Sequence, residues 1–266
     1  MKSVAIIGGG PWARILAKSF SQKCNISHVV TTGNTGNLLA MKSIIPDARI
    51  TDLKTVLEDN DIESVVIAAP IESLARLGCE CLTAGKHVFL EKPGAQRPEE
   101  ISSLQEVRSS LVCMIDYLHL ADPKYHDTKL RVANQACKIS FVWRKLGSFN
   151  NDILLNLVSH DIAMVIDMFG NNEIKNLDIE SLEKDFCKLH YDYGGHPITV
   201  DIDRCSPIGA KRVLFKGPAV ELTWSPNPKA LDFQRDLFLR NVQQNTGFSN
   251  LDLAKEVLSI IEGIRQ

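Results

Sequence analysis

The chain has 266 residues, of which 44% are hydrophobic and 23% are charged, and its formal net charge is −2. This composition is typical of a globular protein with a full core, and the length suits one large domain or two modest ones. The weak net charge and the lack of a basic block argue against non-specific binding to nucleic acid or anionic membranes. No apolar run reaches the roughly 18 residues that span a bilayer.

The seven cysteines are odd in number and scattered, which argues against a disulfide framework. Cys79 and Cys81 are two residues apart on an expected helix, so they point to different faces and make a poor metal pair. The N-terminus lacks the regions of a signal peptide. We therefore expect reduced thiols, no metal site and a cytoplasmic protein.

The N-terminal residues follow the order strand, tight turn, helix. An apolar run at 4–7 leads into Gly8, Gly9 and Gly10, and a helical pattern follows. Gly8 allows a sharp turn, Gly10 lets the backbone approach a phosphate, and the small Ala13 lets the helix pack on the strand. The pattern G-x-G-x-x-A is a variant of the dinucleotide-binding fingerprint, and the free N–H groups of the helix start would face a pyrophosphate.

Expected strands and helices alternate over residues 1–120. We expect strands at 4–7, 26–31, 50–51, 64–69, 87–90 and 111–115, and helices at 12–22, 38–43, 53–57, 73–84 and 98–109. Continuous apolar strands separated by helices predict a parallel sheet that is covered on both faces. This region is therefore expected to be a Rossmann domain that binds NAD or NADP.

The pattern changes after Pro123. Shorter strands are expected at 139–144, 186–193, 198–204, 211–216 and 219–224, and helices at 154–169 and 251–264. They predict a second, α+β domain over residues 121–266, with an open and mainly antiparallel sheet and a last helix that packs back on the first domain. The fold class is α/β, a doubly wound parallel sheet followed by this α+β domain.

The loop after the second strand carries no carboxylate. Dinucleotide folds often use an acid there to bind the ribose hydroxyls, whereas this chain has Thr31, Thr32 and Asn34. The absence of a negative charge and the presence of hydroxyl and amide groups favour NADP over NAD. The alternative is a polar turn, with NAD held by other contacts.

Lys92 stands just past the carboxyl end of an expected strand, at the edge where open α/β sheets bind ligands. A lysine there could donate to a substrate oxygen, or accept its proton as a hydride leaves. Taken alone, a lysine in solvent is the preferred interpretation.

Three motifs together resemble the glucose–fructose oxidoreductase/inositol dehydrogenase (Gfo/Idh/MocA) family. They are the glycine-rich turn, Ala68-Ala69-Pro70 after the fourth apolar strand and Glu91-Lys92-Pro93 after the fifth, and the likeness continues to Asn250-Leu251-Asp252. The resemblance implies that the cofactor is bound by Gly8, Gly10, Pro11, Trp12, Ala13, Thr31, Thr32, Asn34, Ala69, Pro70, Glu91 and Lys92.

The resemblance also implies the catalytic residues. Lys92 would lie beside the substrate and the nicotinamide, and His160, in the stretch 154–162, would be the proton shuttle. Asn156 and His160 are four residues apart on an expected helix and so face the same cleft. The family usually has aspartate where this chain has Asn156, which supplies no negative charge. This departure implies a retuned pH optimum, a different substrate or weak catalysis.

The segment 114–125 is similar to one in family members that oxidise nucleotide-linked sugars. It makes Asp116, Tyr117 and His119 candidate substrate contacts, together with Asn156 and His160. The short second domain leaves room for a smaller or carrier-linked substrate instead.

The resulting hypothesis is an NAD(P)-dependent oxidoreductase that acts on a sugar, nucleotide sugar or related polyol or ketone. The alternatives are a catalytically weak dinucleotide-binding regulator or sensor of the same fold, and an imine or enone reductase. The expected partner is a small-molecule substrate, with neither nucleic acid nor membrane. By analogy with the family we expect a homodimer or dimer of dimers, with the apolar strands at 200–202 and 213–215 suited to pairing.

Overall fold

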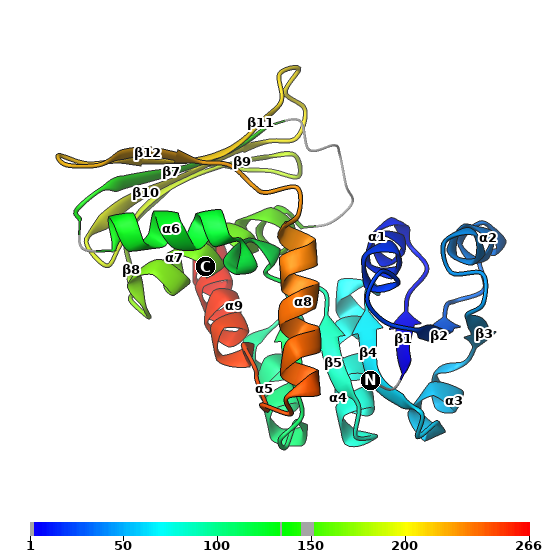
Figure 1. The fold of residues 1–266 in the computed structure, drawn as a ribbon. Coiled ribbons are helices and arrows are strands. Elements are labelled where there is room, and N and C mark those ends of the chain that lie inside the picture. Colours follow the sequence, from blue (N-terminus) through cyan, green and yellow to red (C-terminus); the bar gives the residue numbers. More distant parts are fainter. Residues whose placement is uncertain (1–2, 134, 145–151) are drawn as a thin grey trace. The chain divides into compact units, whose positions relative to one another are not determined.

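In the computed structural model, which describes residues 3–133, 135–144 and 152–266, the N-terminal apolar strands form one parallel sheet in the order β3-β2-β1-β4-β5-β6 (Figure 1). Its strands are β1 (Ser3–Ile7), β2 (Ile26–Val30), β3 (Arg49–Thr51), β4 (Ile62–Ile67), β5 (His87–Leu90) and β6 (Cys113–Ile115). The helices between them are α1 (Pro11–Phe20), α2 (Thr35–Ile44), α3 (Leu53–Glu58), α4 (Ile71–Thr83) and α5 (Pro98–Val107). The expected doubly wound parallel sheet is therefore confirmed.

The strand order reverses between β1 and β4. Because parallel crossovers are right-handed, α1 and α2 cover one face of the sheet, and α3, α4 and α5 cover the other. Such a reversal places a crevice at the carboxyl ends of the two strands, where open α/β sheets bind their ligands.

Helix α8 (Ala230–Gln243) returns to this sheet from the C-terminal half of the sequence. Phe238 joins Phe20 and Phe89 in a cluster of edge-to-face rings whose centroids lie 5.2 to 6.2 Å apart. Arg235 donates to the backbone oxygen of Ser19 at 2.8 Å. These contacts make residues 234–255 part of the first unit.

The chain accordingly divides into two compact units. Unit 1 comprises Met1–Asp116 and Gln234–Lys255, and unit 2 comprises Tyr117–Phe233 and Glu256–Gln266. The first division follows β6 directly, and the last one falls within α9 (Leu251–Arg265). The expected division at residue 120 did not include the return of residues 234–255, because their contacts with unit 1 are made by segments far away in the sequence.

The sheet of unit 2 has the order β12-β11-β7-β10-β9-β8. Its strands are β7 (Lys138–Arg144), β8 (Ile174–Leu182), β9 (Phe186–Tyr193), β10 (His196–Asp203), β11 (Ala210–Lys216) and β12 (Glu221–Trp224). Among the strands that the structure describes in this sheet, only β7 and β10 pair in parallel, so the expected mainly antiparallel sheet is confirmed. The other elements of this unit are η1 (Leu118–Ala121), α6 (Pro123–Val132), η2 (Leu154–Val158) and α7 (Ser159–Phe169).

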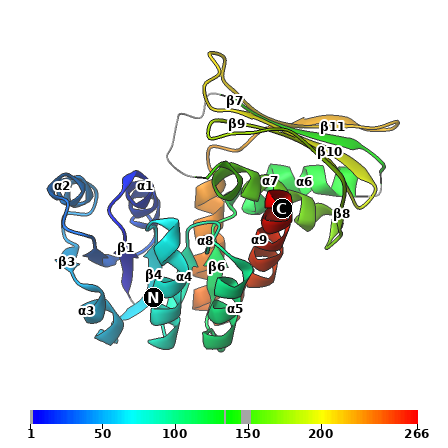
Figure 2. The same cartoon turned by 180° about the vertical axis from the view of Figure 1, so that it is seen from behind.

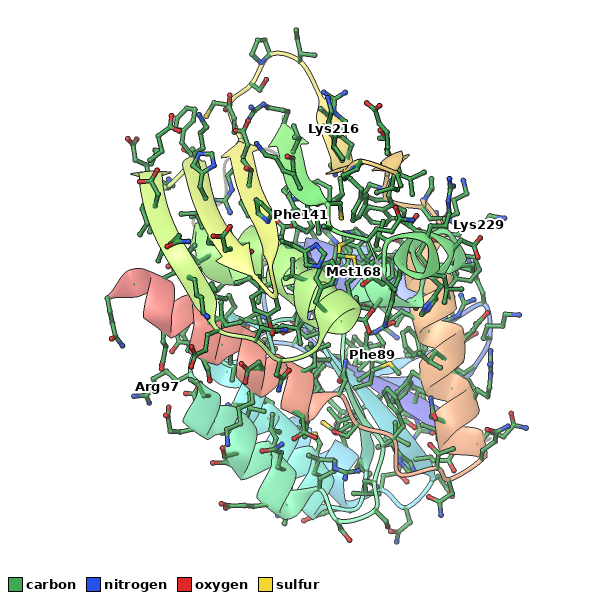
Figure 3. All side chains as sticks on the ribbon, turned by 90° about the vertical axis from the view of Figure 1, so that its left-hand side faces the viewer. Phe89, Arg97, Phe141, Met168, Lys216 and Lys229 are labelled. Atoms are coloured by element: carbon green, nitrogen blue, oxygen red, sulfur yellow. The ribbon has the colours of Figure 1, made fainter. Side chains whose placement is uncertain are left out.

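One face of this second sheet is covered by α6 and α7, and no helix in the described part of the chain covers the other (Figures 1 and 2). Alternate strand residues such as Phe141 point to the covered face, where Met168 of α7 is also buried. Figure 3 shows this core, together with Phe89 in the sheet of unit 1 and the exposed Arg97, Lys216 and Lys229.

The structure corrects the expectation for the apolar strand residues at 200–202 and 213–215. Val200, Ile202, Val213 and Phe215 are all buried in the core of unit 2. Side chains alternate across a strand, so the open face carries the residues between them, which include Asp201. A second chain that pairs with this face would therefore meet mainly polar groups.

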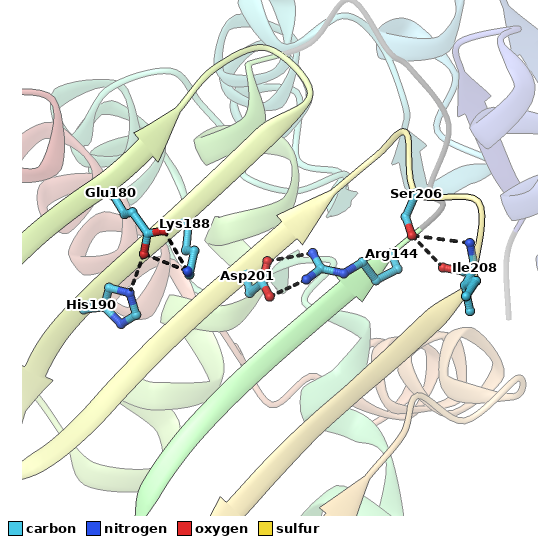
Figure 4. Close-up of polar contacts among 7 residues, drawn as sticks. All are labelled: Arg144, Glu180, Lys188, His190, Asp201, Ser206 and Ile208. Carbon is cyan, nitrogen blue, oxygen red and sulfur yellow. Dashed lines mark hydrogen bonds and ion pairs between the residues drawn. The ribbon is translucent and has the colours of Figure 1, made fainter.

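Ion pairs cross this open face (Figure 4). Arg144 on β7 makes a two-pronged ion pair with Asp201 on β10. Glu180 on β8 accepts from Lys188 and His190 on β9. The Arg144–Asp201 pair is half-buried, whereas the pairs of Glu180 are exposed. Exposed pairs contribute little to stability, about 0–1 kcal/mol each, and mainly keep the open face polar.

None of the helices in the described ranges is long and apolar enough to cross a membrane.

Candidate cofactor and catalytic site

The glycine-rich turn after β1 lies against the loops that follow β2 and β4. Gly8 has φ +130°, a conformation that side chains rarely adopt, and its N–H donates to the oxygen of Val30 at 2.8 Å. A Cβ on Gly8 would stand 2.1 Å from the backbone oxygen of Ala68, and one on Gly9 would stand 2.7 Å from Oγ1 of Thr31. Glycine is therefore required here for the close approach of three loops at the carboxyl edge of the sheet.

The start of α1 has the geometry of an anion site. Gly10 is the N-cap residue without a side-chain cap, and Pro11 opens the helix. A Cβ on Gly10 would meet no atom within 4 Å, so the space in front of the helix is open. The indole N–H of Trp12 is buried and has no hydrogen-bond partner in the residues that the structure describes. The first N–H groups of a helix also have no intrahelical partner, so this end fits the pyrophosphate of a dinucleotide.

The loop after β2 runs from Thr31 into the start of α2. Thr31 lies beside Gly9, whereas Thr32 and Asn34 are exposed. Oδ1 of Asn34 accepts the N–H of Asn37 at 3.0 Å and so caps α2. The amide oxygen of Asn34 is therefore committed to the helix, and its NH₂ group is the part suited to a ligand.

The loops after β4 and β5 bring the remaining expected cofactor residues to the same edge. Ala69 and Pro70 follow β4, and Pro70 stands at the N-cap of α4. The N–H of Glu91 donates to the oxygen of Ile67 on β4 at 2.9 Å. Oε2 of Glu91 then accepts the backbone N–H of Lys92 at 2.6 Å, so the two residues turn away from the strand end together.

Asp116 follows the neighbouring strand, β6. Its N–H donates to the oxygen of Leu90 on β5 at 2.9 Å. The preceding residue, Ile115, is held by the side-chain amide of Asn250, which accepts the N–H of Ile115 at 2.7 Å and donates to its oxygen at 2.9 Å. Asp116 is fully buried, and neither of its carboxylate oxygens has a hydrogen-bond partner among the described residues.

Burial shifts the titration of both carboxyl groups at this edge. It raises the pKa of Glu91 to about 7, although the ammonium of Lys92 and the bond from its backbone N–H act in the opposite direction. Burial also raises the pKa of Asp116 well above its usual value, and the negative charge of Glu91 raises it further, while Lys92 lowers it. Clustered shifts of this kind are typical of functional sites.

Unit 2 brings together Tyr117, His119 and His160 of the expected site. The rings of His119 and His160 lie 5.0 Å apart between centroids, and the ring of Tyr117 meets that of His160 edge-on at 6.3 Å. Asn156 lies on η2, a short π-helix that leads into α7. π-turns inside helices are frequent at functional sites. The expected residues thus form one group in each unit, with Lys92 and Asp116 in the first.

Two tryptophans contact His119, and an aspartate binds one of them; the sequence analysis missed all three residues. His119 stacks on Trp143 at 6.0 Å and 11° and meets Trp224 edge-on at 5.2 Å. The indole N–H of Trp143 donates to both carboxylate oxygens of Asp161, at 2.8 and 3.0 Å. The one available signal was the position of Asp161 directly after His160. In the described ranges no cluster of three or more His, Cys, Asp or Glu side chains could hold a metal ion.

Replacing Asp161 with asparagine is expected to stabilise the protein, and to do so more at high pH. Burial raises the pKa of Asp161 well above 3.8, so the folded state binds more protons than the unfolded state. Stability contributed by this group is therefore full below pH 3.8 and is lost as the pH rises towards the folded pKa. Asparagine keeps an acceptor for Trp143 but carries no charge. Urea unfolding at about pH 5 and about pH 8 measures the difference.

The exposed Asp127→Asn serves as the control, and its effect on the free energy of unfolding should be within about 0.5 kcal/mol at both pH values. An Asp161→Asn variant with the same effect at both pH values would show that the buried carboxyl carries no excess proton.

Comparison with known proteins agrees with this geometry. A family model described as "Oxidoreductase family, NAD-binding Rossmann fold" (GFO_IDH_MocA) matches residues 2–117. The scyllo-inositol 2-dehydrogenase (NAD(+)) of Bacillus subtilis (strain 168) is 30% identical over 79 residues, which are 29% of this chain and only 23% of that protein.

Two solved structures share the fold over almost the whole chain. UDP-N-acetylglucosamine 3-dehydrogenase GnnA from Acidithiobacillus ferrooxidans has a TM-score of 0.86 at 15% identity and covers 99% of this chain and 96% of its own. GenD2 from gentamicin A biosynthesis, in complex with NAD, has a TM-score of 0.83 at 16% identity, and the match covers 98% of this chain and 92% of the GenD2 chain. Residues 2–117 therefore match the model of the Gfo/Idh/MocA oxidoreductase family and carry its NAD-binding Rossmann fold, and the whole chain shares the fold of these two solved structures.

Proposed function

We propose that the protein is an NAD(P)-dependent oxidoreductase that acts on the CH–OH or C=O group of a sugar, nucleotide sugar or related polyol or ketone. The observation that carries this proposal is the open space in front of Gly10 at the start of α1, flanked by the loops after β2 and β4. The substrate class is supported by the inositol and UDP-N-acetylglucosamine dehydrogenases that the chain resembles.

The bound nicotinamide would supply the hydride acceptor or donor. Lys92, at the carboxyl end of β5, would donate a hydrogen bond to the reacting oxygen of the substrate and stabilise the negative charge that develops there. His160 would take or return the hydroxyl proton. Asn156 would orient these groups by hydrogen bonding, without the negative charge of an aspartate.

Tyr117 and His119 are proposed substrate contacts, together with Asn156 and His160, and Asp116 lies at the start of the same segment. The rings of Tyr117 and His119 both approach His160, so a substrate that reaches His160 would meet them. We also propose NADP as the preferred cofactor, because Thr31, Thr32 and the NH₂ group of Asn34 present no negative charge to a 2′-phosphate.

Replacing Gly10 with alanine is expected to weaken cofactor binding about tenfold or more, equivalent to ~1.4 kcal/mol, with no change in folding. The backbone of Gly10 has φ −69° and ψ 177°, which alanine adopts freely, and its added Cβ meets no protein atom within 4 Å. That methyl group would instead fill the space proposed for the pyrophosphate. The measurement is a titration with NADH and NADPH, followed by nicotinamide fluorescence and by energy transfer from tryptophan.

Gly263→Ala in α9 is the matched control, because its Cβ also meets nothing within 4 Å, and it should bind like the wild-type protein. If the wild-type protein bound neither cofactor, the oxidoreductase proposal would be wrong. If Gly10→Ala bound as tightly as wild type, the dinucleotide would not cross this turn.

The regulatory or sensor alternative rests on Asn156. It requires cofactor binding without turnover, so activity restored by Asn156→Asp would count against it. We further propose that the open face of the second sheet joins two chains in a homodimer or dimer of dimers. This proposal is supported by the exposed sheet face, whose cross-strand ion pairs would become interface groups.

A further inference from the structure

The carboxyl ends of β5 and β6 hold two acids and one lysine within one short stretch of the sheet edge. Leu90 pairs with Ile115 in the parallel register, so the residues that follow them, Glu91 and Asp116, leave neighbouring strands side by side. The bond from the N–H of Asp116 to the oxygen of Leu90 extends this pairing beyond the strand. Lys92 is the next residue after Glu91, and its backbone N–H donates a hydrogen bond to the carboxylate of Glu91.

This arrangement is held rigidly on the Asp116 side. Ile115 is hydrogen-bonded through both its N–H and its oxygen to the amide of Asn250, and its oxygen also accepts from Gln234 at 3.3 Å. These contacts fix the backbone next to Asp116. Its carboxylate stays buried, without a hydrogen-bond partner in the described part of the chain.

A buried carboxylate without hydrogen bonds is unfavourable unless a cation balances it or a proton neutralises it. One lysine balances only one of the two carboxylates. With both acids ionised the cluster would have a net charge of −1, and with one proton bound to the pair it is neutral. Two interacting carboxyl groups then lose their protons in two separate steps, and the upper step belongs to the pair.

We propose that Asp116, Glu91 and Lys92 form one charge-balanced cluster, in which the two carboxyl groups share a single proton at neutral pH and hold Lys92 as an ammonium ion. Asp116 is then a positioning residue that acts through Lys92. This role rests on the proposed function, in which Lys92 donates to the reacting oxygen. An ammonium ion donates hydrogen bonds and cannot act as a base. Lys92 would therefore serve as the donor to the reacting oxygen, and His160 would take up the proton of the substrate hydroxyl.

The titration of the carboxyl groups tests the cluster without a substrate. We would follow the side-chain carboxyl carbons by ¹³C NMR in wild type, Glu91→Gln and Asp116→Asn, with the exposed Asp47→Asn as the control. Glu91→Gln should lower the pKa of Asp116 by about one unit or more, because the repelling charge is gone. Asp116→Asn should leave a single step, and Asp47→Asn should leave both. An Asp116 that titrates at the same pH in wild type and Glu91→Gln would overturn the proposal.

A second readout is the pH profile of turnover. Turnover should fall at high pH when Lys92 loses its proton, and this fall should move to lower pH in Asp116→Asn, because one of the two carboxylates that hold the ammonium is then missing. A profile unchanged in this variant would show that Asp116 does not act through Lys92, even if the carboxyl groups are coupled. Absence of any NAD(P)H binding would remove the oxidoreductase proposal instead, while the NMR titration would still decide whether the proton is shared.

Discussion

Replacing Lys92 with methionine is expected to lower kcat about 10²- to 10⁴-fold, the usual range for the loss of a group that handles a proton or a developing charge. Methionine keeps the length and the apolar stem of lysine but has no ammonium. The reacting oxygen would then develop its charge without a donor from the end of β5. The measurement is steady-state turnover on an identified substrate, combined with an NAD(P)H titration of the same variant.

Lys18→Met is the matched control, because Lys18 is an exposed residue of α1 and its loss should leave kcat unchanged. Lys92→Met should also raise the pKa of Glu91 above its value of about 7, since the ammonium of Lys92 opposes the effect of burial there. A Lys92→Met variant that turns over as fast as wild type would refute the catalytic role. One that loses turnover but leaves the titration of Glu91 unchanged would refute the charge balance alone.

Sequence patterns predicted well the elements that bury the side chains of one face in the core and expose those of the other. The alternation in β9 gave Phe186–Tyr193 as the structure has it, because every second side chain is buried. The helix α6 was missed because it is mostly polar, with only Tyr125 and Val132 buried. The edge strand β8 was missed for a related reason, since its side chains are almost all exposed and show no alternation.

In the candidate site, too, the features set by neighbouring residues could be predicted, whereas those that depend on contacts between distant residues could not. The glycine-rich turn could be predicted because the conformation of Gly8 and the open helix start are properties of adjacent residues. The clamp of Asn250 on Ile115 joins residues 135 positions apart, and the bond from Trp143 to Asp161 is buried between a strand and a helix. Contacts of this kind arise from packing, and no spacing in the sequence marks them.

The turn at Gly8 also provides the second large effect that we expect. Gly8→Ala should destabilise the protein by about 3 kcal/mol or more, a large part of the ~5–15 kcal/mol that stabilises a typical fold. The backbone at φ +130° excludes a side chain, and the added Cβ would stand 2.1 Å from the oxygen of Ala68. That oxygen belongs to the backbone after β4, so it cannot move aside without breaking the bond from the N–H of Ala68 to Ile7.

Two other glycines separate the two causes of this destabilisation, which are the backbone strain and the clash of the added Cβ. Gly33 has φ +86° with nothing within 4 Å of its Cβ position, so Gly33→Ala should show the strain alone, about 1 kcal/mol. Gly10→Ala has neither strain nor clash and should stay within about 0.5 kcal/mol of wild type. Urea unfolding should therefore show the largest loss of stability for Gly8→Ala, a smaller loss for Gly33→Ala and the smallest for Gly10→Ala. Equal losses of stability for Gly8→Ala and Gly33→Ala would mean that the loops after β1 and β4 do not approach each other as closely as the structure shows. Because these two loops border the crevice proposed for the dinucleotide, the shape of that crevice would then be wrong.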